Sequence, residues 1–448
     1  MSGHSFALEA VLQEPKRTEL SVRRERAILV GVLLPGEDHG GEDPLDELAR
    51  LARTAGAHVV ERLAQRLDRI DPHTYVGRGK AEELARLCAA VDADAILCDH
   101  DLRPSQIHAL EAVSATKVLD RSELILDIFA TRAKTRQAKV QVELAQLEYT
   151  FPRLTRMWSH LDRHGGGIGT RGPGERQLES DRRAMQRRMS EMRRELEHIA
   201  LRKSREVAAR RDEFKVCLVG YTNAGKSTLL NALTGAESFV EDRLFATLDT
   251  KTRVWELDGG RRVLLSDTVG FIRRLPHHLV ASFHATLEEA TEADLLLHVI
   301  DISHPDCLHQ TETVIEALAE IGCADTPSLA AFNKIDVAHP TPEAELVAAV
   351  CPNHVRVSAI EGTGLDSLAA RVGESIRSRE TRVTVQCHAG NGRIQACLHR
   401  VGHVLSTERR DEQVVIEARV EPRHLPALHA AADDGDSVVV HAAPGEAS

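Results

Sequence analysis

The sequence predicts an α/β protein of several domains: an N-terminal α/β domain, a long helical hairpin, a second α/β domain with a doubly wound and mostly parallel sheet, and a small C-terminal α+β domain. Apolar runs of strand length alternate with helical patterns in two separate parts of the chain, which is typical of parallel α/β sheets. A stretch with helical spacing and no strand signal separates these two parts. At 448 residues, the chain is also too long for a single core.

The N-terminal α/β domain is predicted over residues 25–128, after a loose leader over residues 1–24 that has no clear periodicity. Its strands are short apolar runs, and helical patterns lie between most of them. The predicted strands are Ala27–Leu34, His58–Val60, Ala95–Cys98 and Lys117–Leu119, and the helical patterns lie around Leu45–Ala52 and Ala81–Ala90. We therefore expect a small parallel sheet covered by helices.

The helical hairpin is predicted over residues 129–212. Apolar residues recur at helical spacing on two segments, and those of the second segment form a heptad-like seam: Val140, Leu144, Leu147 and Phe151 on the first, and Met185, Met189, Met192, Leu196 and Ile199 on the second. Between them, the segment Gly165–Gly174 contains six glycines and one proline, a composition that no helix accommodates. The simplest arrangement is an antiparallel pair of helices with a glycine-rich tip.

The second α/β domain is predicted over residues 213–378 and the C-terminal domain over residues 379–448. The strands of the second domain are Lys215–Val219, Val263–Ser266, Leu295–Ile300, Leu329–Phe332 and Val355–Val357. The C-terminal domain is predicted as a βαβα unit formed by Val383–Cys387, Gly392–Leu405, Gln413–Val420 and Pro426–Ala431.

Composition excludes several classes of protein. The formal net charge of −11 argues against a chain that coats nucleic acid through its overall field, although it allows a local basic surface. The eight cysteines form no CxxC pair, so neither a zinc site nor a disulfide framework is indicated. No apolar run reaches the length of about 20 residues that spans a bilayer, and the first residues lack a secretory pattern. We therefore expect a cytoplasmic protein.

A phosphate-binding loop is predicted at GYTNAGKS, which matches the pattern GxxxxGK[ST] and lies directly after a strand and before a helix. The glycines allow backbone N–H groups to face phosphates, Lys226 can reach the β- and γ-phosphates, and Ser227 can offer its hydroxyl to Mg²⁺. The predicted nucleotide-binding residues of this loop are Gly220, Tyr221, Thr222, Asn223, Ala224, Gly225, Lys226 and Ser227.

Three further segments follow predicted strands. Asp267, Thr268, Val269 and Gly270 form a DTVG motif, in which Asp267 can hold the Mg²⁺ shell and the Gly270 N–H can sense a γ-phosphate. The next is NKID, whose last residue offers two acceptors to the N1–H and the exocyclic amine of guanine, donors that adenine lacks; its residues are Asn333, Lys334, Ile335 and Asp336. The third is Ser358, Ala359 and Ile360, which can offer a backbone N–H to guanine O6. Together they predict a guanine nucleotide site.

A switch segment is predicted between the phosphate loop and DTVG, at Phe245, Ala246, Thr247, Leu248 and Asp249. Thr247 is our candidate for a second Mg²⁺-binding hydroxyl, with Thr250 and Thr252 as competitors close by in the sequence. After Gly270 comes Phe271, at the position where Ras-like proteins have a glutamine that orients the attacking water. We predict that Lys226, Thr247, Gly270 and Phe271 form the catalytic region. Hydrolysis without a partner should be slow, whether or not Phe271 also packs within the switch.

These motifs together resemble the HflX family of translation-factor-class GTPases, in the Obg–HflX group. The resemblance spans residues 25–375 and rests on GYTNAGKST, LFATLDTKTR, DTVGFIRRLPHHLVASFHATLEEA, NKID and SAIEGTG, and further on YVGRGKAEEL, QVELAQLEYTFPRL and GGGIGTRGPGE. It implies a P-loop GTPase domain that converts GTP to GDP with Mg²⁺, binds the large ribosomal subunit through the hairpin and the Gly165–Gly174 tip, and is stimulated by ribosomes. It further implies the splitting or rescue of stalled or idle ribosomes under stress. Thr250 departs from the proline usual in the family and loosens the switch backbone.

Two features bear on these implications. The stretch Asp181–Arg211 contains eleven Lys or Arg and five acidic residues, which suits RNA phosphate, although such runs are often a solvated helix face with internal ion pairs. The resemblance implies ATP binding in the N-terminal domain, at Gly77–Lys80, but a short G-x-G before a helix is more often only a turn. The rival hypothesis is a GTP-sensing regulatory scaffold without a role at the ribosome.

Overall fold

The structure is a computed structural model that describes most of the chain. Within the described ranges, the side chains of residues 173–178, 203–208 and 259 are left out. The described residues are 25–35, 43–153, 173–208, 213–235, 244–245, 250–273, 289–339, 341–433 and 435–441. The predicted leader, most of the glycine-rich tip and four of the five switch residues lie outside them. No helix of the described part is both long enough and apolar enough to cross a lipid bilayer.

The N-terminal domain has four parallel strands in the order β2-β1-β3-β4. Its central strand β1 is apolar on both faces, because alternate side chains pack against different helices: Ala27 and Leu29 toward α2 and α5, and Ile28 and Val30 toward α3 and α4. The elements are β1 (Arg26–Leu33), α2 (Asp46–Thr54), β2 (His58–Arg66), α3 (Arg78–Val91), β3 (Ala95–Cys98), α4 (Pro104–Ser114), β4 (Lys117–Leu119) and α5 (Arg121–Arg132). The predicted domain boundary after residue 128 falls inside α5.

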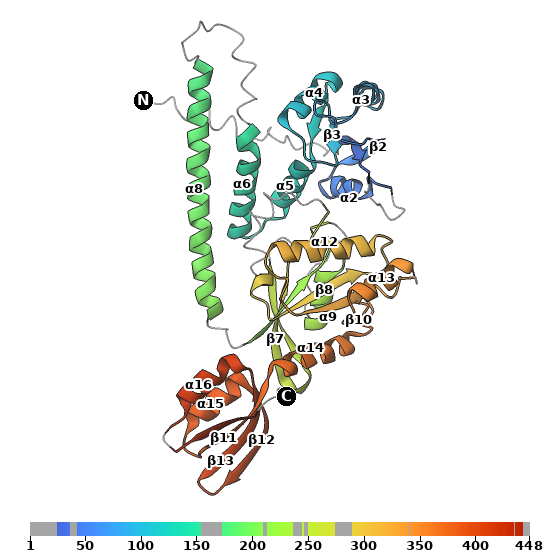
Figure 1. Ribbon diagram of the computed structural model, residues 1–448. Coiled ribbons are helices and arrows are strands. Elements are labelled where there is room, and N and C mark those ends of the chain that lie inside the picture. The colour runs from blue at the N-terminus through green and yellow to red at the C-terminus, as the bar shows by residue number, and fades with distance from the viewer. Residues whose placement is uncertain are drawn as a thin grey trace.

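The helical hairpin consists of α6 (Arg136–Thr150), a short 3₁₀ turn η1 (Phe151–Arg153) and α8 (Pro173–Ala208). The two helices run side by side (Figure 1), and ion pairs join Arg136 to Glu195 and Arg188 to Glu143, so the helices are antiparallel. The predicted seam is present: Val140, Leu144, Met189 and Met192 are buried together, with Leu147, Phe151 and Leu196 partly buried against them.

The second α/β domain has six strands in the order β10-β9-β8-β5-β7-β6, parallel except for β6. Helices α9 and α14 cover one face, and α12 and α13 cover the other. The elements are β5 (Phe214–Val219), α9 (Lys226–Thr234), β6 (Lys251–Leu257), η2 (Asp258–Gly260), β7 (Arg261–Asp267), β8 (Leu295–Asp301), α12 (Cys307–Glu320), β9 (Ser328–Asn333), α13 (Pro342–Val350), β10 (His354–Arg356) and α14 (Leu365–Arg379).

The C-terminal domain corrects the predicted βαβα unit, because it is a βαββαβ unit with an antiparallel sheet in the order β12-β13-β11-β14. This is the ferredoxin-like arrangement. The predicted helix Gly392–Leu405 ends at Val401, and β12 begins at Gly402, where a Cβ atom would lie 2.9 Å from Val420 Cγ2. The elements are β11 (Thr381–His388), α15 (Gly392–Val401), β12 (Gly402–Arg410), β13 (Gln413–Val420), η3 (Pro422–His424), α16 (Leu425–Ala431) and β14 (Ser437–His441).

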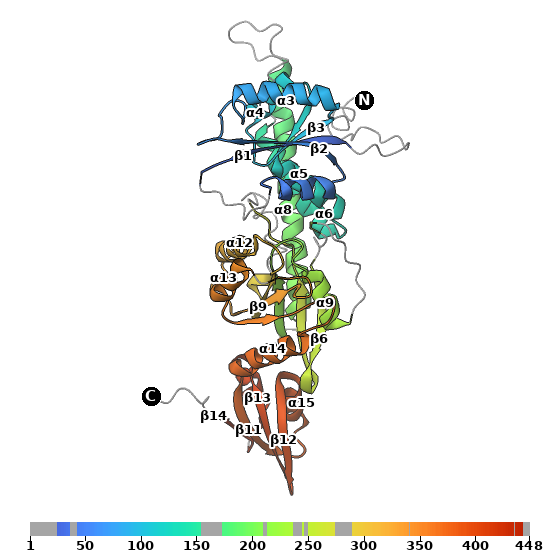
Figure 2. The same cartoon turned by 90° about the vertical axis from the view of Figure 1, so that its right-hand side faces the viewer.

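The domains are stacked along one long axis, with the N-terminal domain at one end and the C-terminal domain at the other (Figures 1 and 2). The N-terminal domain and the second α/β domain share a single apolar cluster, in which Phe129 of α5 lies edge-on to Phe245, with 4.7 Å between ring centroids. The C-terminal domain is joined to the second α/β domain through ion pairs from Arg423 to Asp294 and from Arg261 to Glu380. The first of these interfaces lies beside the predicted nucleotide site.

Candidate nucleotide-binding site

The loop Gly220–Ser227 connects β5 to α9, as predicted, and two of its glycines have conformations that other residues rarely adopt. Gly220 has φ +152°, and a Cβ atom there would lie 2.3 Å from the Val299 carbonyl oxygen. Gly225 has φ +95°, and its Cβ atom would lie 2.3 Å from Asn333 Nδ2. Both positions therefore require glycine, since the obstacle at Gly220 is backbone and the one at Gly225 is a buried amide.

The ammonium group of Lys226 lies inside this loop. Its Nζ donates to the carbonyl oxygens of Gly220, at 3.0 Å, and Tyr221, at 2.8 Å, and the residue is only 6% exposed. Burial lowers the pKa of Lys226 to about 8, although the Asp267 carboxylate opposes this shift. A negatively charged phosphate oxygen beside Nζ would favour the charged form of the lysine and so oppose the effect of burial.

The DTVG segment is joined to the phosphate loop by side-chain and backbone contacts. Ser227 Oγ donates to Asp267 Oδ2 at 2.6 Å, and Asp267 is fully buried. Thr222 N donates to the Phe271 carbonyl oxygen at 2.7 Å, and Phe271 N donates to the Gly220 carbonyl oxygen at 3.1 Å. The two segments therefore form one unit.

Within that unit, Thr268 and Val269 are also buried, and Thr268 Oγ1 donates to the Leu218 carbonyl oxygen. Gly270 lies so close to the phosphate loop that a Cβ atom there would approach Thr222 Cα to 2.8 Å and Lys226 Nζ to 2.9 Å. The side chain of Phe271 is buried among apolar groups of the interdomain cluster.

Asn333 links the two ends of the predicted site. Its Nδ2 donates to the Ala224 carbonyl oxygen at 2.9 Å, and its Oδ1 accepts from Ala359 N at 3.0 Å. The residue is 2% exposed. The NKID segment, the phosphate loop and the Ser358–Ile360 loop are therefore held in one arrangement by a single buried amide.

The remaining predicted residues on this side differ in exposure. Ile335 N donates to the Val357 carbonyl oxygen, and Ser358 is fully buried, with its hydroxyl accepting from Glu361 N. Asp336 is exposed, and Ile360 is 78% exposed. The carboxylate and the loop beside it are therefore accessible to a ligand.

Of the predicted switch, the structure describes only Phe245, which has φ +54° and is buried against the N-terminal domain. Ala246, Thr247, Leu248 and Asp249 lie outside the described residues. The role of Thr247 toward Mg²⁺ therefore stays a prediction.

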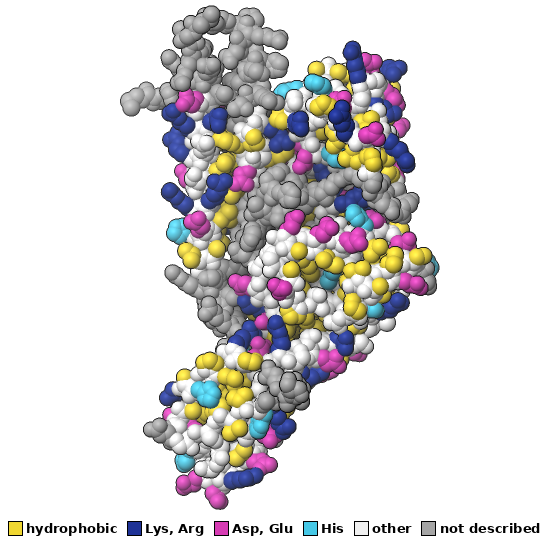
Figure 3. All heavy atoms as spheres, in the orientation of Figure 1, with side chains coloured by type: hydrophobic (Ala, Val, Ile, Leu, Met, Phe, Trp, Pro, Cys, Tyr) yellow, Lys and Arg dark blue, Asp and Glu magenta, His cyan; other side chains and the backbone are white. Residues whose placement is uncertain are grey.

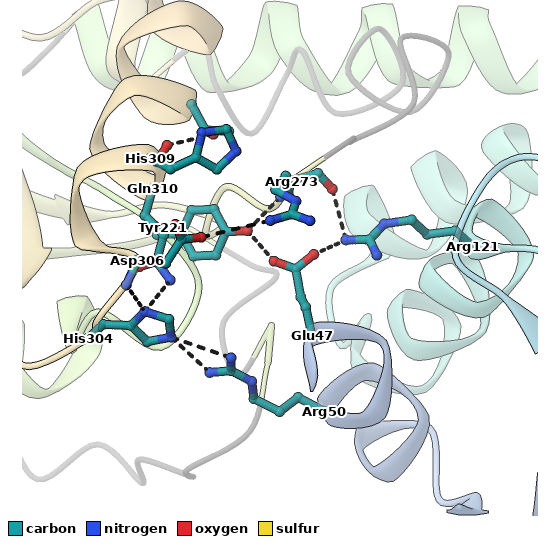
Figure 4. A network of polar contacts seen from close by, with 10 residues as sticks. Glu47, Arg50, Arg121, Tyr221, Arg273, His304, Asp306, His309 and Gln310 are labelled. Carbon is teal, nitrogen blue, oxygen red and sulfur yellow. Dashed lines mark hydrogen bonds and ion pairs between the residues drawn. The ribbon is translucent and has the colours of Figure 1, made fainter. Parts of the chain in front are cut away.

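Sequence patterns gave no signal for a polar network that joins the N-terminal domain to this site (Figure 4). The Glu47 carboxylate accepts from the Tyr221 hydroxyl and from the Arg121 guanidinium. Arg121 also donates to the Arg273 carbonyl oxygen at 2.9 Å, and Arg273 N donates to Tyr221 Oη at 2.8 Å. On the same interface, Arg50 contacts the His304 ring.

The protonation states of this network follow from its geometry. Burial acts to raise the pKa of Glu47, but the Arg121 guanidinium and the Tyr221 hydroxyl outweigh it and hold this pKa below its usual value. Burial and the neighbouring carboxylate raise the pKa of the Tyr221 hydroxyl well above its usual value. The tyrosine therefore stays protonated and donates to an ionised carboxylate.

Because His298 in β8 is buried, we predict that the stability of the protein depends on pH. Burial, together with the smaller effect of the Lys226 ammonium, lowers the pKa of His298 from 6.5 to about 4. Because the unfolded chain takes up this proton first, the stabilising contribution is complete above pH 6.5 and is lost as the pH falls toward 4. We expect the free energy of unfolding to fall by about 3 kcal/mol over this range from this group alone.

Chemical denaturation at several pH values, compared with His298→Leu, measures this contribution. The variant should lose stability less steeply between pH 6.5 and 4.5 than the unchanged protein. Replacing the exposed His309 with Gln serves as the control and should leave the slope unchanged. Parallel slopes for the unchanged protein and His298→Leu would show that the ring is not held neutral.

The fold and the site define a class of protein. A parallel sheet with a glycine-rich phosphate loop after one strand, a buried carboxylate at the end of the next and an Asn-Lys-x-Asp segment after another is the arrangement of P-loop GTPases. Three family models match successive parts of the chain: "GTP-binding GTPase N-terminal" over residues 42–130, "GTP-binding GTPase Middle Region" over 132–211 and "50S ribosome-binding GTPase" over 215–334.

Comparison with curated proteins narrows this class. GTPase HflX of Lacrimispora saccharolytica is 44% identical over 425 residues, covering 94% of this chain and 98% of the relative. GTPase HflX of Escherichia coli is 40% identical over 380 residues, covering 84% and 89% of the two chains. The chain belongs to the HflX family of GTPases and is a GTP hydrolase.

Among solved structures, a GTP-binding protein from the archaeon Sulfolobus solfataricus, crystallised in complex with GDP, is 24% identical with a TM-score of 0.41. The match covers 78% of this chain and 98% of that chain.

Proposed function

We propose that GTP binds between the phosphate loop and the NKID segment, with its β- and γ-phosphates at Lys226 and its base at Asp336. The observation that carries this proposal is the buried Asn333 amide, which fixes the phosphate loop and the Ser358–Ile360 loop relative to each other. In the bound state, Lys226 exchanges its two carbonyl acceptors for phosphate oxygens. The carboxylate of Asp336 accepts from the N1–H and the amine of guanine.

The residues beside the phosphates suit Mg²⁺. Ser227 Oγ and Asp267 Oδ2 lie 2.6 Å apart, and hydroxyl and carboxylate oxygens are ligands that Mg²⁺ prefers. We propose that Ser227, Asp267 and Thr247 hold the ion, directly or through water. The ion neutralises charge on the phosphates, while the Gly270 N–H senses the γ-phosphate.

We infer that hydrolysis is slow until a partner completes the catalytic arrangement. The side chain of Phe271 is 4% exposed and apolar, so it cannot orient a water molecule as an amide does. A second group must therefore supply that contact or rearrange the switch.

We propose that the partner is the large ribosomal subunit and that α8 is a main contact. Lys and Arg side chains, with acidic ones between them, lie along the exposed face of α8 (Figure 3). Arg183, Arg187 and Arg194 line an open hollow there together with Glu191. Several other arginines are already paired with glutamates of α6, including Arg188 with Glu143 and Arg193 with Glu148. Arg183 is paired with Glu179 within α8, so Arg187 and Arg194 are the better candidates for RNA phosphate.

Within this proposal, GTP favours docking on the ribosome, and hydrolysis favours release. The cellular task is the splitting or rescue of stalled ribosomes in the cytoplasm under stress. The alternative of a GTP-sensing scaffold makes no use of the basic face of α8. ATP binding at Gly77–Lys80 of the N-terminal domain stays a subsidiary proposal.

Sedimentation with purified ribosomes in a non-hydrolysable GTP analogue tests the ribosomal role. We expect the unchanged protein to sediment with the large subunit. The double variant Arg187→Glu, Arg194→Glu should bind at least about tenfold more weakly, and its affinity should depend less steeply on salt concentration, by the equivalent of about two phosphate contacts. Absence of the unchanged protein from the large-subunit fraction at moderate salt would favour the scaffold.

The control variant reverses the same number of charges elsewhere, at the exposed residues Arg356 and Arg371 of the GTPase domain. It should sediment as the unchanged protein does. If it loses binding equally, net charge rather than the face of α8 determines the interaction.

A further inference from the structure

The loop Asp301–Asp306 lies between β8 and α12, beside the predicted base-binding segment. Its first residue, Asp301, pairs in register with Asn333 of the neighbouring strand and is 8% exposed. The Asp301 carboxylate accepts from Lys334 Nζ at 2.6 Å through Oδ2, and its Oδ1 accepts from Ser303 N at 3.0 Å. The carboxylate is therefore itself fixed, and it fixes the end of the lysine side chain.

The backbone of Lys334 is fixed as well. Its φ of +63° is a left-handed conformation uncommon outside glycine, and its carbonyl oxygen accepts from Val337 N and Ala338 N in the turn that follows. With the backbone and the ammonium both restrained, the four-carbon stem between them has few conformations left. A lysine restrained at one end only would sample many more.

We propose that Asp301 is a positioning residue for guanine recognition: by holding the ammonium of Lys334, it fixes the apolar stem of that lysine along the face of the base that Asp336 recognises. The inference rests on the proposed guanine-binding role of the NKID segment. It adds a residue that lies outside every recognised motif of the sequence. This raises the affinity because the lysine side chain is already ordered before the nucleotide binds, so that binding does not have to order it.

The far side of the same loop provides a control. His304 contacts Arg50 of the N-terminal domain, and Asp306 lies 3.8 Å from the Arg273 guanidinium (Figure 4). Removing Arg50 therefore disturbs the loop while leaving the pair of Asp301 and Lys334 intact. If a loss of nucleotide affinity came from disorder of the whole loop, replacing Arg50 would cause it as well as replacing Asp301.

A double-mutant cycle on GDP affinity, measured with a fluorescent GDP analogue, tests the proposal. We expect Asp301→Asn to raise the Kd about three- to tenfold in the unchanged background and to have little further effect in a Lys334→Met background. In steady-state hydrolysis, the loss should fall on KM more than on kcat. Asp301→Glu should recover part of the affinity, because it restores the charge, and Arg50→Ala should leave it unchanged.

Each other outcome has a distinct meaning. Equal losses from Asp301→Asn in both backgrounds, or an equal loss from Arg50→Ala, would overturn the positioning role. No loss from Asp301→Asn when Lys334→Met weakens binding would overturn it too, while leaving the guanine site in place. If Lys334→Met does not change GDP affinity, the proposed role of Lys334 in the guanine site fails. Asp301→Glu keeps the test valid if Asp301→Asn does not fold.

Discussion

Replacing Asn333 with alanine should weaken GDP binding about 100-fold or more, because a single buried amide holds both sides of the proposed site. The change leaves the Ala224 carbonyl oxygen and the Ala359 N–H without their partner. Each unsatisfied buried group costs about 1–3 kcal/mol. Direct titration of the protein with a fluorescent GDP analogue measures the loss.

The matched control is Asn353→Ala. Asn353 is exposed, and it also joins neighbouring segments of the same sheet, since its Nδ2 donates to the Ser328 carbonyl oxygen at 3.2 Å. It lies away from the phosphate loop, so GDP affinity should stay within about twofold of the original value. An Asn333→Ala protein that binds GDP with less than about a threefold loss would contradict the view that this amide organises the site.

Replacing Asp336 with asparagine should change which base the protein prefers. The carboxylate accepts from two donors of guanine, whereas an amide has one acceptor and donates to the oxygen that xanthine has in place of the guanine amine. We expect GDP affinity to fall about 100-fold and xanthosine diphosphate to become the better ligand. Asp336 is exposed, so the fold should tolerate the change.

Competition between the two nucleoside diphosphates for a fluorescent probe measures this reversal. Asp325→Asn serves as the control, because it removes the same charge at another exposed position on the segment that precedes β9. An unchanged base preference in Asp336→Asn would show that another group reads the base.

Strands buried on both faces were predicted well from the sequence. β1, β3 and β5 are continuous apolar runs, and their bounds agree to within one residue at each end. β2 was predicted over three residues and has nine, because its exposed and buried residues are mixed. β6 was missed because it is an edge strand with only two buried residues, Trp255 and Leu257. Local apolar patterns therefore find central strands. Of the edge strands in the first two sheets, they find the short β4 and β10 to within one residue but shorten β2 and miss β6.

A similar limit applies to the site. The phosphate loop, DTVG and NKID are contiguous, so the local chain carries their signal. Glu47 lies 174 residues from Tyr221 and 74 from Arg121, and no spacing rule links such residues. Asp301 could have been suspected, because it ends a parallel strand beside Asn333 and ligands bind at the carboxyl ends of such strands.

The length of α8 has a mechanical consequence. Its 36 residues span about 54 Å at 1.5 Å per residue, and its C-terminal end leads into β5, the strand that ends at the phosphate loop. The shorter α6 packs against only part of this length, so α8 extends beyond the helix that supports it. A rotation of α8 by about 10° about its C-terminal end would move its N-terminal end by about 9 Å.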